Sequence, residues 1–507
     1  MMFNQKILCI GNETEDTDIK VSGLAKGSNT VNHGLITSSQ INIEQVGYYH
    51  TSICDMSPGD IAHISNKFNR IILLDQPKES YPHYKNLVTS LRLMYDLDLN
   101  GINVTYRENI NAQEFMNWRN FLKDNKSFCF YPFLALVDNI DSTCICPKSR
   151  EPITKISEIK DWRTDPHYNK IREKMIRGEL LPEHCQDCYD REAEGQESTR
   201  QYETLEWTER IQAKSVNDFM SSSPMYYELR PSNKCNIMCR TCDDGHSHLI
   251  EKEWKKYKEI PLKSWKFTNT DWKYINFSNL EKIYVGGGEP TIITEFYDFL
   301  RRCIAEGKTD FELAIGTNGM KFSNALVELL DNFSKVVFSF SYDGYKRVND
   351  YIRWGSDFDT IVKNGRMLQE RGHKIGLQSV FSMYSITRMH EVFEFYDQEY
   401  PMSGLLVQVG SSQDNAFMPF NHPRPDLVLE SMRRCQQTKT YYTNGRSIRT
   451  MIDLLIDHYS SPSYKVDEKL LKKFYEFNDK LDRYRNSRLG DYITELAEAR
   501  SIYFGNE

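Results

Sequence analysis

The stretch that decides the fold is residues 225–242, which read MYYELRPSNKCNIMCRTC. A short strand-like segment at 225–230 runs into three closely spaced cysteines, Cys235, Cys239 and Cys242. Three thiolates on one loop suit an iron–sulfur cluster, because cysteine sulfur holds such clusters. A 4Fe–4S cluster held by three thiolates keeps one iron open to another molecule. A structural zinc site would instead need a fourth protein ligand and a closed shell.

Strand and helix signals alternate along the chain after this loop. The candidate strands are 225–230, 282–287, 311–317, 336–343, 374–382 and 404–409, and candidate helices at 246–258, 295–306, 324–333, 358–371 and 389–396 fall between most of them. Six such repeats with right-handed crossovers predict an α/β fold, a parallel, partial (β/α)6 barrel of the TIM type. Ligand sites in such a sheet lie at the carboxyl ends of the strands.

Polar and glycine-rich motifs follow three of these strands. The second strand runs into Gly286-Gly287-Gly288-Glu289-Pro290, the third ends at Thr317-Asn318-Gly319, and the fourth ends at Ser341-Tyr342-Asp343-Gly344. Glycines let the backbone approach a ligand closely, and a carboxylate can receive an ammonium group. Asn-Gly and Asp-Gly are also strong turn dipeptides, which is the structural alternative at the last two motifs.

The cysteine triad with the Gly-Gly-Glu-Pro run resembles the radical S-adenosylmethionine (SAM) superfamily. The resemblance covers about residues 126–410, and it implies that Cys235, Cys239 and Cys242 hold a 4Fe–4S cluster whose open iron chelates the methionine end of SAM. It further implies that the cluster's electron cleaves SAM to a 5′-deoxyadenosyl radical. The cofactor-binding positions that it implies are Gly287, Gly288, Glu289, Pro290, Thr317, Asn318, Ser341 and Asp343. For Asp343, cofactor contact and turn chemistry are equally good interpretations, and Arg353 is either a carboxylate partner or structural.

One residue departs from the family pattern. Many members carry an aromatic residue just before the third cysteine, where it can lie against adenine, and this chain has Thr241 there. Adenine packing is therefore expected from another residue, such as Met238 or Val380.

A second set of cysteines precedes the barrel. Cys185 and Cys188 form a Cys-x2-Cys knuckle, which suits zinc or iron–sulfur alike, and Cys129 with either Cys144 or Cys146 completes four ligands. The segment resembles the Twitch module, a short relative of the SPASM domain that holds an auxiliary 4Fe–4S cluster, although that module usually follows the barrel. The resemblance favours Cys146 over Cys144 as a ligand, and a zinc knuckle that only folds the segment is the alternative.

The remaining segments divide the chain into five parts. Apolar runs at 6–11, 70–75 and 101–106, with a helix at 84–97, predict a small α/β domain over residues 1–125, to which the sequence assigns no role. The cysteine-rich module takes 126–200, a helix with a linker 201–224, the barrel 225–415 and a helical region 416–507. In that last region Leu470, Phe474, Phe477, Leu481 and Tyr484 keep helical spacing and predict a packing face.

Composition and charge exclude several classes of protein. The 64 basic and 71 acidic residues are intermixed, so no basic surface for nucleic acid is expected. No apolar run is long enough to span a bilayer, and no export signal is present. Clustered cysteines favour metal binding in a reducing compartment, so a cytoplasmic location is expected.

The sequence thus predicts a radical SAM enzyme with a second, auxiliary cluster. We expect hydrogen-atom abstraction from a peptide or protein side chain first, and from a sugar, nucleotide or other small molecule second. A reducing partner such as flavodoxin or ferredoxin is implied by the family's chemistry. The competing hypothesis is a non-catalytic iron–sulfur or zinc protein.

Overall fold

The structure is a computed structural model that describes most of the chain beyond residue 111. Its described residues are 7–10, 48–51, 70–73, 103–105, 112–139, 142–149, 151–193, 198–262, 272–400, 405–409, 415–438, 440–441 and 446–505. The chain divides into two compact units, 1–118 with 436–453 and 119–435 with 454–507. Among the described residues, no helix has both the length and the apolar character needed to cross a membrane.

The first unit contains a small parallel sheet. Its four described strands pair in the order β2 (Tyr48–Thr51), β1 (Ile7–Ile10), β3 (Arg70–Leu73) and β4 (Asn103–Thr105). Three of them lie within the strands predicted from sequence, whereas β2 was not predicted. The helix predicted at 84–97 lies outside the described residues.

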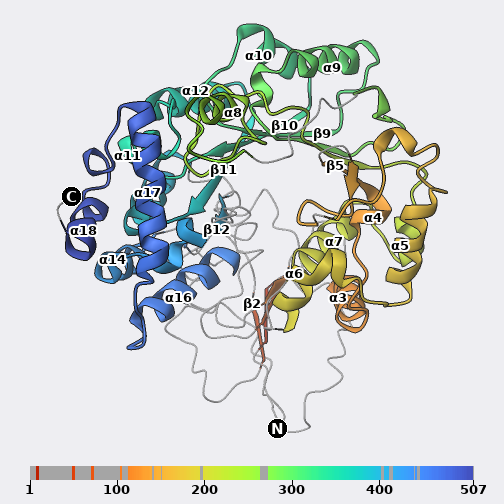
Figure 1. Ribbon diagram of the computed structural model, residues 1–507. Helices are drawn as coiled ribbons and strands as arrows, with labels where there is room; N and C mark the ends of the chain where they lie inside the picture. The colour runs from red at the N-terminus through yellow and green to blue at the C-terminus, as the bar shows by residue number, and fades with distance from the viewer. Residues whose placement is uncertain are drawn as a thin grey trace. The chain divides into compact units, whose positions relative to one another are not determined.

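The second unit is built around a curved sheet of eight strands in its described residues (Figure 1). The order is β12-β11-β10-β9-β8-β7-β5-β6, and every neighbouring pair is parallel except β5 with β6. The bounds are β5 Ala135–Asn139, β6 Ser142–Cys144, β7 Tyr226–Leu229, β8 Lys282–Val285, β9 Glu312–Thr317, β10 Lys335–Ser341, β11 Lys374–Phe381 and β12 Leu405–Val409. The edge strands β12 and β6 stand at opposite ends of this order, so the barrel is unclosed.

The fold predicted from sequence is confirmed, with one addition. All six predicted barrel strands are present within one or two residues of their expected bounds. The seventh parallel strand, β5, comes from the cysteine-rich segment and pairs with β7. That segment therefore extends the barrel sheet rather than forming a separate layer.

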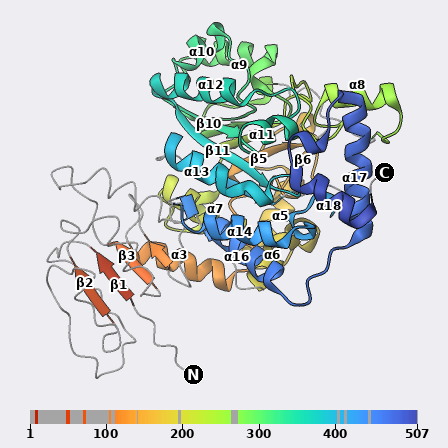
Figure 2. The same cartoon turned by 90° about the vertical axis from the view of Figure 1, so that its left-hand side faces the viewer.

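Helices connect and cover the strands of the second unit (Figures 1 and 2). Between β7 and β12 they are α8 His248–Tyr257, α9 Thr294–Ala305, α10 Asn324–Leu330, α11 Arg347–Ile352, α12 Phe358–Glu370 and α13 Met389–Glu399. Before β7 the helices are α3 Ala112–Asp124, α4 Tyr131–Leu134, α5 Pro166–Ile176, α6 Pro182–Ala193 and α7 Thr199–Arg210. After β12 the chain continues as α14 Pro425–Cys435, α16 Arg446–Ser460, α17 Glu468–Arg485 and α18 Thr494–Phe504.

Side-chain alternation gives the sheet two different faces. On β9 and β10, every second residue is buried, as at Ile315 and Phe340. A Cβ placed on Gly365 of α12 would meet the Phe340 ring at 3.0 Å, so this face packs on the helices. The opposite, inner face carries small and polar residues such as Gly316 and Ser339, which are paired in register. The space beside Gly316 on this face is taken by the Tyr284 ring and hydroxyl of β8.

Helix α7 covers the inner face of the sheet at the amino ends of its strands. Arg210 donates a hydrogen bond to Glu312 at 2.9 Å, and Lys282 reaches the same carboxylate at 3.1 Å. Trp207 stacks on Tyr226 with ring centroids 5.8 Å apart. The segment predicted as a helix with a linker thus covers the amino ends of the strands.

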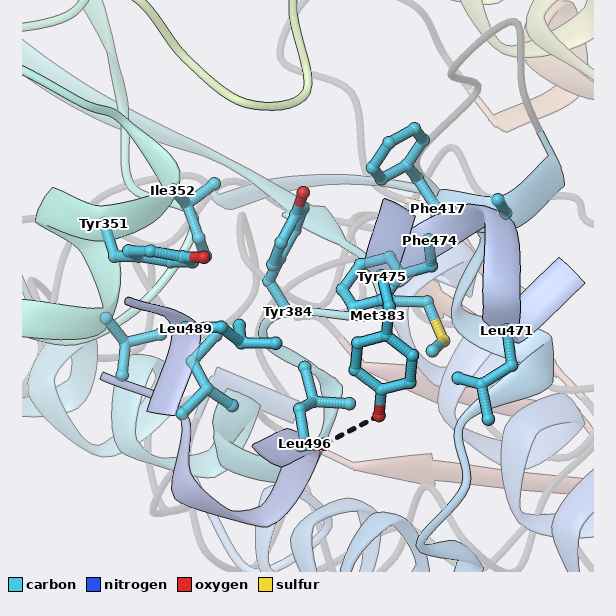
Figure 3. Packing of buried hydrophobic residues seen from close by; sticks show 13 residues of the cluster. Tyr351, Ile352, Met383, Tyr384, Phe417, Leu471, Phe474, Tyr475, Leu489 and Leu496 are labelled. Atoms are coloured by element: carbon cyan, nitrogen blue, oxygen red, sulfur yellow. Dashed lines mark hydrogen bonds between the residues drawn. The ribbon is translucent and has the colours of Figure 1, made fainter. Parts of the chain in front are cut away.

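The helical C-terminal region has its own apolar core, which Figure 3 shows. Leu471, Phe474 and Tyr475 of α17 pack there against Tyr351 and Ile352 of α11. The amphipathic face predicted from sequence is present, displaced by one residue at its start because Leu471 rather than Leu470 is fully buried. Helix α17 is therefore anchored to the barrel.

Candidate metal and cofactor site at the strand ends

The loop that carries the cysteine triad leaves the carboxyl end of β7 and enters α8. The main-chain N–H groups of Met238 and Arg240 donate to the carbonyls of Trp354 and Ile352, at 2.8 and 2.7 Å. The N–H of Cys235 donates to the Nδ1 atom of His248 at 3.1 Å. These bonds hold the loop between the end of α11 and the start of α8.

The three thiols of this loop influence one another electrostatically; Cys235 is buried, and Cys239 and Cys242 are half-buried. Burial, reinforced by the charge of Cys239, raises the pKa of Cys235 to about 12. Burial, with the charges of Cys239, Asp243 and Cys235, raises the pKa of Cys242 well above its usual value. Thiols that repel one another as thiolates are suited to a cation or cluster that removes their protons. Among the described residues, no three Cys, His, Asp or Glu side chains are already gathered in metal-binding geometry.

Two buried arginines face the middle cysteine. Burial raises the pKa of Cys239, while the positive charges of Arg353 and Arg485 lower it. The Nε atom of Arg353 and the Nη1 atom of Arg485 are buried and have no hydrogen-bond partner. A buried N–H without an acceptor is costly. A group that carries acceptor atoms, such as the sulfides of an iron–sulfur cluster, would satisfy such donors, so the residues present fit the implied cofactor.

The glycine run lies directly against the cysteine loop. The N–H of Gly288 donates to the Ser232 carbonyl at 2.9 Å, and the N–H of Glu289 donates to the Lys234 carbonyl at 2.8 Å. A Cβ on Gly288 would overlap the Lys234 carbonyl oxygen and approach its carbon to 2.8 Å. Gly287 has a φ of +99°, a conformation that favours glycine. Two of these glycines are therefore required by the close approach of two chain segments, independently of any ligand.

The carboxylate of Glu289 is fully buried and connects two strand ends. Its oxygens accept hydrogen bonds from the Thr317 hydroxyl at 2.8 Å and from the Asn318 N–H at 2.7 Å. Thr291 adds its N–H at 3.2 Å and its hydroxyl at 2.7 Å. Burial raises the pKa of Glu289, against these hydrogen bonds. In this arrangement the side chain fixes the loops after β8 and β9, and Pro290 opens a short buried 3-10 helix (Pro290–Ile292) behind it.

The third and fourth strand ends face the cysteines in different ways. The Asn318 amide donates to Asn236 at 2.7 Å and lies 3.9 Å from the Cys235 sulfur. Asp343 accepts from Arg353 at 2.8 Å and from the Val380 N–H at 3.1 Å, so it joins β10, β11 and α11. Ser341 is half-buried on the inner face of β10. Asn318 thus borders the Cys235 thiol and Ser341 ends β10, while Asp343 and Arg353 have structural partners.

The second cysteine set lies on three separate elements. Cys185 and Cys188 stand one turn apart on α6, where side chains three residues apart share a face. Burial, with the charges of Cys146, Cys185 and Cys188, raises the pKa of Cys129. Cys144, in contrast, is buried within β6 and acts on Tyr168. Cys146 thus acts on Cys129 together with the two cysteines of α6.

Three contributors to the site have no recognisable sequence signal. His248 accepts the Cys235 N–H. Arg240, between the second and third cysteines, is completely buried and pairs with Asp482 of α17. Glu253 of α8 forms a buried ion pair with Arg485. The partners of Arg240 and Glu253 lie more than 200 residues away along the chain.

Comparison with known proteins identifies part of the chain. Residues 229–392, which include the cysteine triad and the glycine run, match the sequence model of the Radical SAM superfamily. An "Uncharacterized protein" of Methanothermobacter thermautotrophicus is 32% identical over 113 residues, which cover 22% of this chain and 43% of that protein. The chain therefore aligns with less than half the length of this curated relative.

Solved structures show limited similarity. "Native anSMEcpe with bound AdoMet" is 16% identical, with 36% of this chain and 52% of that chain covered and a TM-score of 0.29. SuiB of Streptococcus suis bound to S-adenosylmethionine is 18% identical, with 48% and 52% covered and a TM-score of 0.29. SuiB bound to precursor peptide SuiA is 15% identical, with 61% and 69% covered and a TM-score of 0.30. Residues 229–392, about a third of the chain, thus match the Radical SAM superfamily by sequence.

Proposed function

We propose that this radical SAM enzyme binds a 4Fe–4S cluster at Cys235, Cys239 and Cys242 and uses it to cleave S-adenosylmethionine reductively. The observation that carries the proposal is the buried triad loop itself. Its thiols share one environment with two arginines whose buried N–H groups have no acceptor. When bound, the cluster supplies the electron that cleaves SAM to a 5′-deoxyadenosyl radical, which takes a hydrogen atom from the substrate.

The residues proposed to hold SAM line the neighbouring strand ends. The backbone of Gly287 and Gly288 would receive its amino group, with Glu289 and Pro290 fixing that loop. Asn318 and Ser341 offer hydrogen-bonding groups beside the cysteine loop. Thr317 and Asp343 are proposed to support the SAM-binding residues indirectly. Thr317 donates a hydrogen bond to Glu289, and Asp343 accepts one from Arg353.

The second cysteine set is proposed to hold an auxiliary 4Fe–4S cluster through Cys129, Cys146, Cys185 and Cys188. Their mutual charge effects support the grouping. Glu228 of β7 acts on Cys146, and it also accepts a hydrogen bond from Arg230, five residues before the triad. A substrate on the inner face near this pair would lie between the two cysteine sets.

The proposed substrate is polar, with a peptide or protein side chain first and a sugar, nucleotide or other small molecule second. The inner face of the middle strands supports this class, since Ser339, Ser341 and Gln378 present polar side chains there. Arg230 is about one-fifth exposed beside them and offers further N–H donors. A flavodoxin- or ferredoxin-like reductant is the proposed electron source.

The experiment is anaerobic reconstitution with iron and sulfide, followed by reduction in the presence of SAM. Wild-type protein should bind about eight irons per chain and release 5′-deoxyadenosine, as two 4Fe–4S clusters require. A Cys235/Cys239/Cys242→Ala variant should retain about half of the iron and should release no 5′-deoxyadenosine. Cys303→Ala, in a buried cysteine of α9 outside both sets, is the matched control and should behave as wild type. SAM cleavage by the triple variant would refute the proposal, and so would a wild-type chain that takes up zinc alone.

A further inference from the structure

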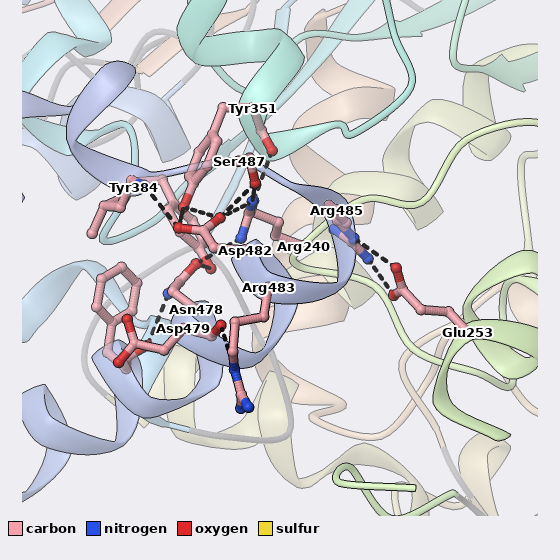
Figure 4. A network of polar contacts seen from close by, with 12 residues as sticks. Arg240, Glu253, Tyr351, Tyr384, Asn478, Asp479, Asp482, Arg483, Arg485 and Ser487 are labelled. Carbon is pink, nitrogen blue, oxygen red and sulfur yellow. Dashed lines mark hydrogen bonds and ion pairs between the residues drawn. The ribbon is translucent and has the colours of Figure 1, made fainter. Parts of the chain in front are cut away.

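Helix α17 reaches the cysteine triad from the far end of the chain. Arg240 is the residue directly after Cys239, and its side chain is completely buried. Its guanidinium donates to Asp482 at 2.5 Å, to the Asn478 amide oxygen at 3.1 Å and to the Ser487 hydroxyl at 2.9 Å. Figure 4 shows that these partners come from α17 and the turn after it.

The same guanidinium also contacts α11 of the barrel. Arg240 donates through Nε to the Tyr351 carbonyl at 2.9 Å and lies 3.6 Å above the Tyr351 ring. The Tyr351 hydroxyl in turn donates to Asp482 at 3.1 Å. One buried cation therefore connects the cysteine loop, α11 and α17. Breaking such a pair leaves an uncompensated buried charge, which is strongly unfavourable.

A second ion pair joins α17 to the helix that follows the triad. Arg485 donates to Glu253 of α8 through two hydrogen bonds of 3.0 and 2.8 Å, and both side chains are more than nine-tenths buried. The remaining Nη1 atom of Arg485 is buried without a partner.

Apolar contacts complete the connection. Leu481 of α17 belongs to one buried cluster with Ile250 and Trp254 of α8, and Met238 and Cys242 of the triad loop pack against it. The triad loop is thus in contact with α8, α11 and α17.

We propose that α17 is a functional part of the cluster site: Asp482 positions the triad loop through Arg240, and the buried cation of Arg485, paired with Glu253 of α8, makes the bound cluster easier to reduce. The reducing effect rests on the proposed function, since it requires a cluster at the triad. The positioning of the loop does not, because it concerns the protein's own contacts. A positive charge beside a cluster favours its reduced, more negative form.

The chain offers matched controls two or three residues away on the same helix. Asp479 pairs with Arg500 and Arg483 pairs with Glu259, and these acidic and basic residues of α17 are exposed. Asp482→Asn is therefore compared with Asp479→Asn, and Arg485→Gln with Arg483→Gln. Arg485→Lys keeps the positive charge but loses the bidentate hydrogen bonding to Glu253.

The first measurement is alkylation of the three triad thiols in metal-free protein by iodoacetamide, followed by mass spectrometry. Asp482→Asn should speed alkylation of Cys235 by about tenfold or more, because this thiol is buried and an opened loop exposes it. Asp479→Asn should change the rate less than about twofold, as expected of a surface pair. Equal rates in the two variants would overturn the positioning role, and thermal unfolding of each variant checks that the fold is retained.

The second measurement is the midpoint potential of the triad cluster in reconstituted protein, followed by electron paramagnetic resonance. Arg485→Gln should lower the potential, Arg485→Lys should restore it toward wild type, and Arg483→Gln should leave it unchanged. An unchanged potential in Arg485→Gln overturns the role of that cation. Absence of any cluster in wild-type protein would instead refute the proposed function, with the alkylation result still deciding the positioning role.

Discussion

Gly288→Ala tests whether the glycine run shapes the site by packing against the cysteine loop. Gly288 does not have a positive φ, so alanine is acceptable to its backbone and the obstacle is contact alone. The new Cβ would overlap the Lys234 carbonyl oxygen and lie 2.8 Å from two carbonyl carbons, of Asn233 and Lys234. These are backbone atoms, so no side chain can rotate away.

The cost follows from the movement that relieves the overlap. An ordinary contact needs about 3.4 Å, so the two segments must separate by at least about 0.6 Å. Overpacking of this kind costs about 1–3 kcal/mol, and each stretched hydrogen bond between the segments adds about 1 kcal/mol. We therefore expect a loss of about 2–4 kcal/mol in the free energy of unfolding. Since Cys235 follows Lys234 directly, the triad should also hold its cluster poorly.

The assay combines urea unfolding with iron analysis after anaerobic reconstitution. Gly307→Ala is the control, because its Cβ meets no atom within 4 Å and only the positive φ is strained, at about 1 kcal/mol. Gly288→Ala should lose triad iron while Gly307→Ala keeps it. If Gly288→Ala retained full iron and lost no more stability than Gly307→Ala, the packing explanation would be wrong.

Three further predictions concern other parts of the second unit. Cys146→Ser should abolish metal binding at the second cysteine set and Cys144→Ser should preserve it, because Cys146 acts on Cys129 while Cys144 is buried in β6 beside Tyr168; iron and zinc analysis of the two variants decides. Arg200→Met should destabilise the chain by about 3–5 kcal/mol, because it strands the partly buried Glu192 and three backbone carbonyls, whereas Arg177→Met at an exposed pair should unfold as wild type in urea. Burial lowers the pKa of His422 to about 4, so its contribution to stability is complete above about pH 6.5 and is lost as the pH falls toward 4, by about 3 kcal/mol in all. Unfolding free energies between pH 4 and 7 should show this slope in wild-type protein and a shallower one in His422→Phe.

The barrel was predictable because its signals are local. Apolar alternation in β9, β10 and β11 and amphipathic spacing in α9 and α12 occupy short windows, and the structure confirms these elements within a few residues. The strand β5 was missed because its partner β7 begins about 90 residues later. The sequence left Cys144 and Cys146 open as alternatives because the two residues are close in sequence. They differ in the structure in that Cys144 is the last residue of β6, whereas Cys146 lies after the strand.

The candidate site was predictable in its residue types and not in all of its roles. The motifs located the cysteine loop, the glycine run and the strand ends. Glu289 was expected to contact a ligand, yet full burial obliges its carboxylate to take the hydroxyl and N–H groups of Thr291, Thr317 and Asn318. The pairing of Arg240 with Asp482 spans 242 residues, so no local pattern could show it.

The most direct test of the central claim is electron paramagnetic resonance of the reduced, reconstituted protein with and without SAM. A Cys129/Cys146/Cys185/Cys188→Ser variant should be used, so that only the triad can hold a cluster. We expect a 4Fe–4S signal whose shape changes when SAM is added and which disappears when Cys235, Cys239 and Cys242 are also replaced. A signal that is indifferent to SAM, or one that survives removal of the triad, would contradict the account.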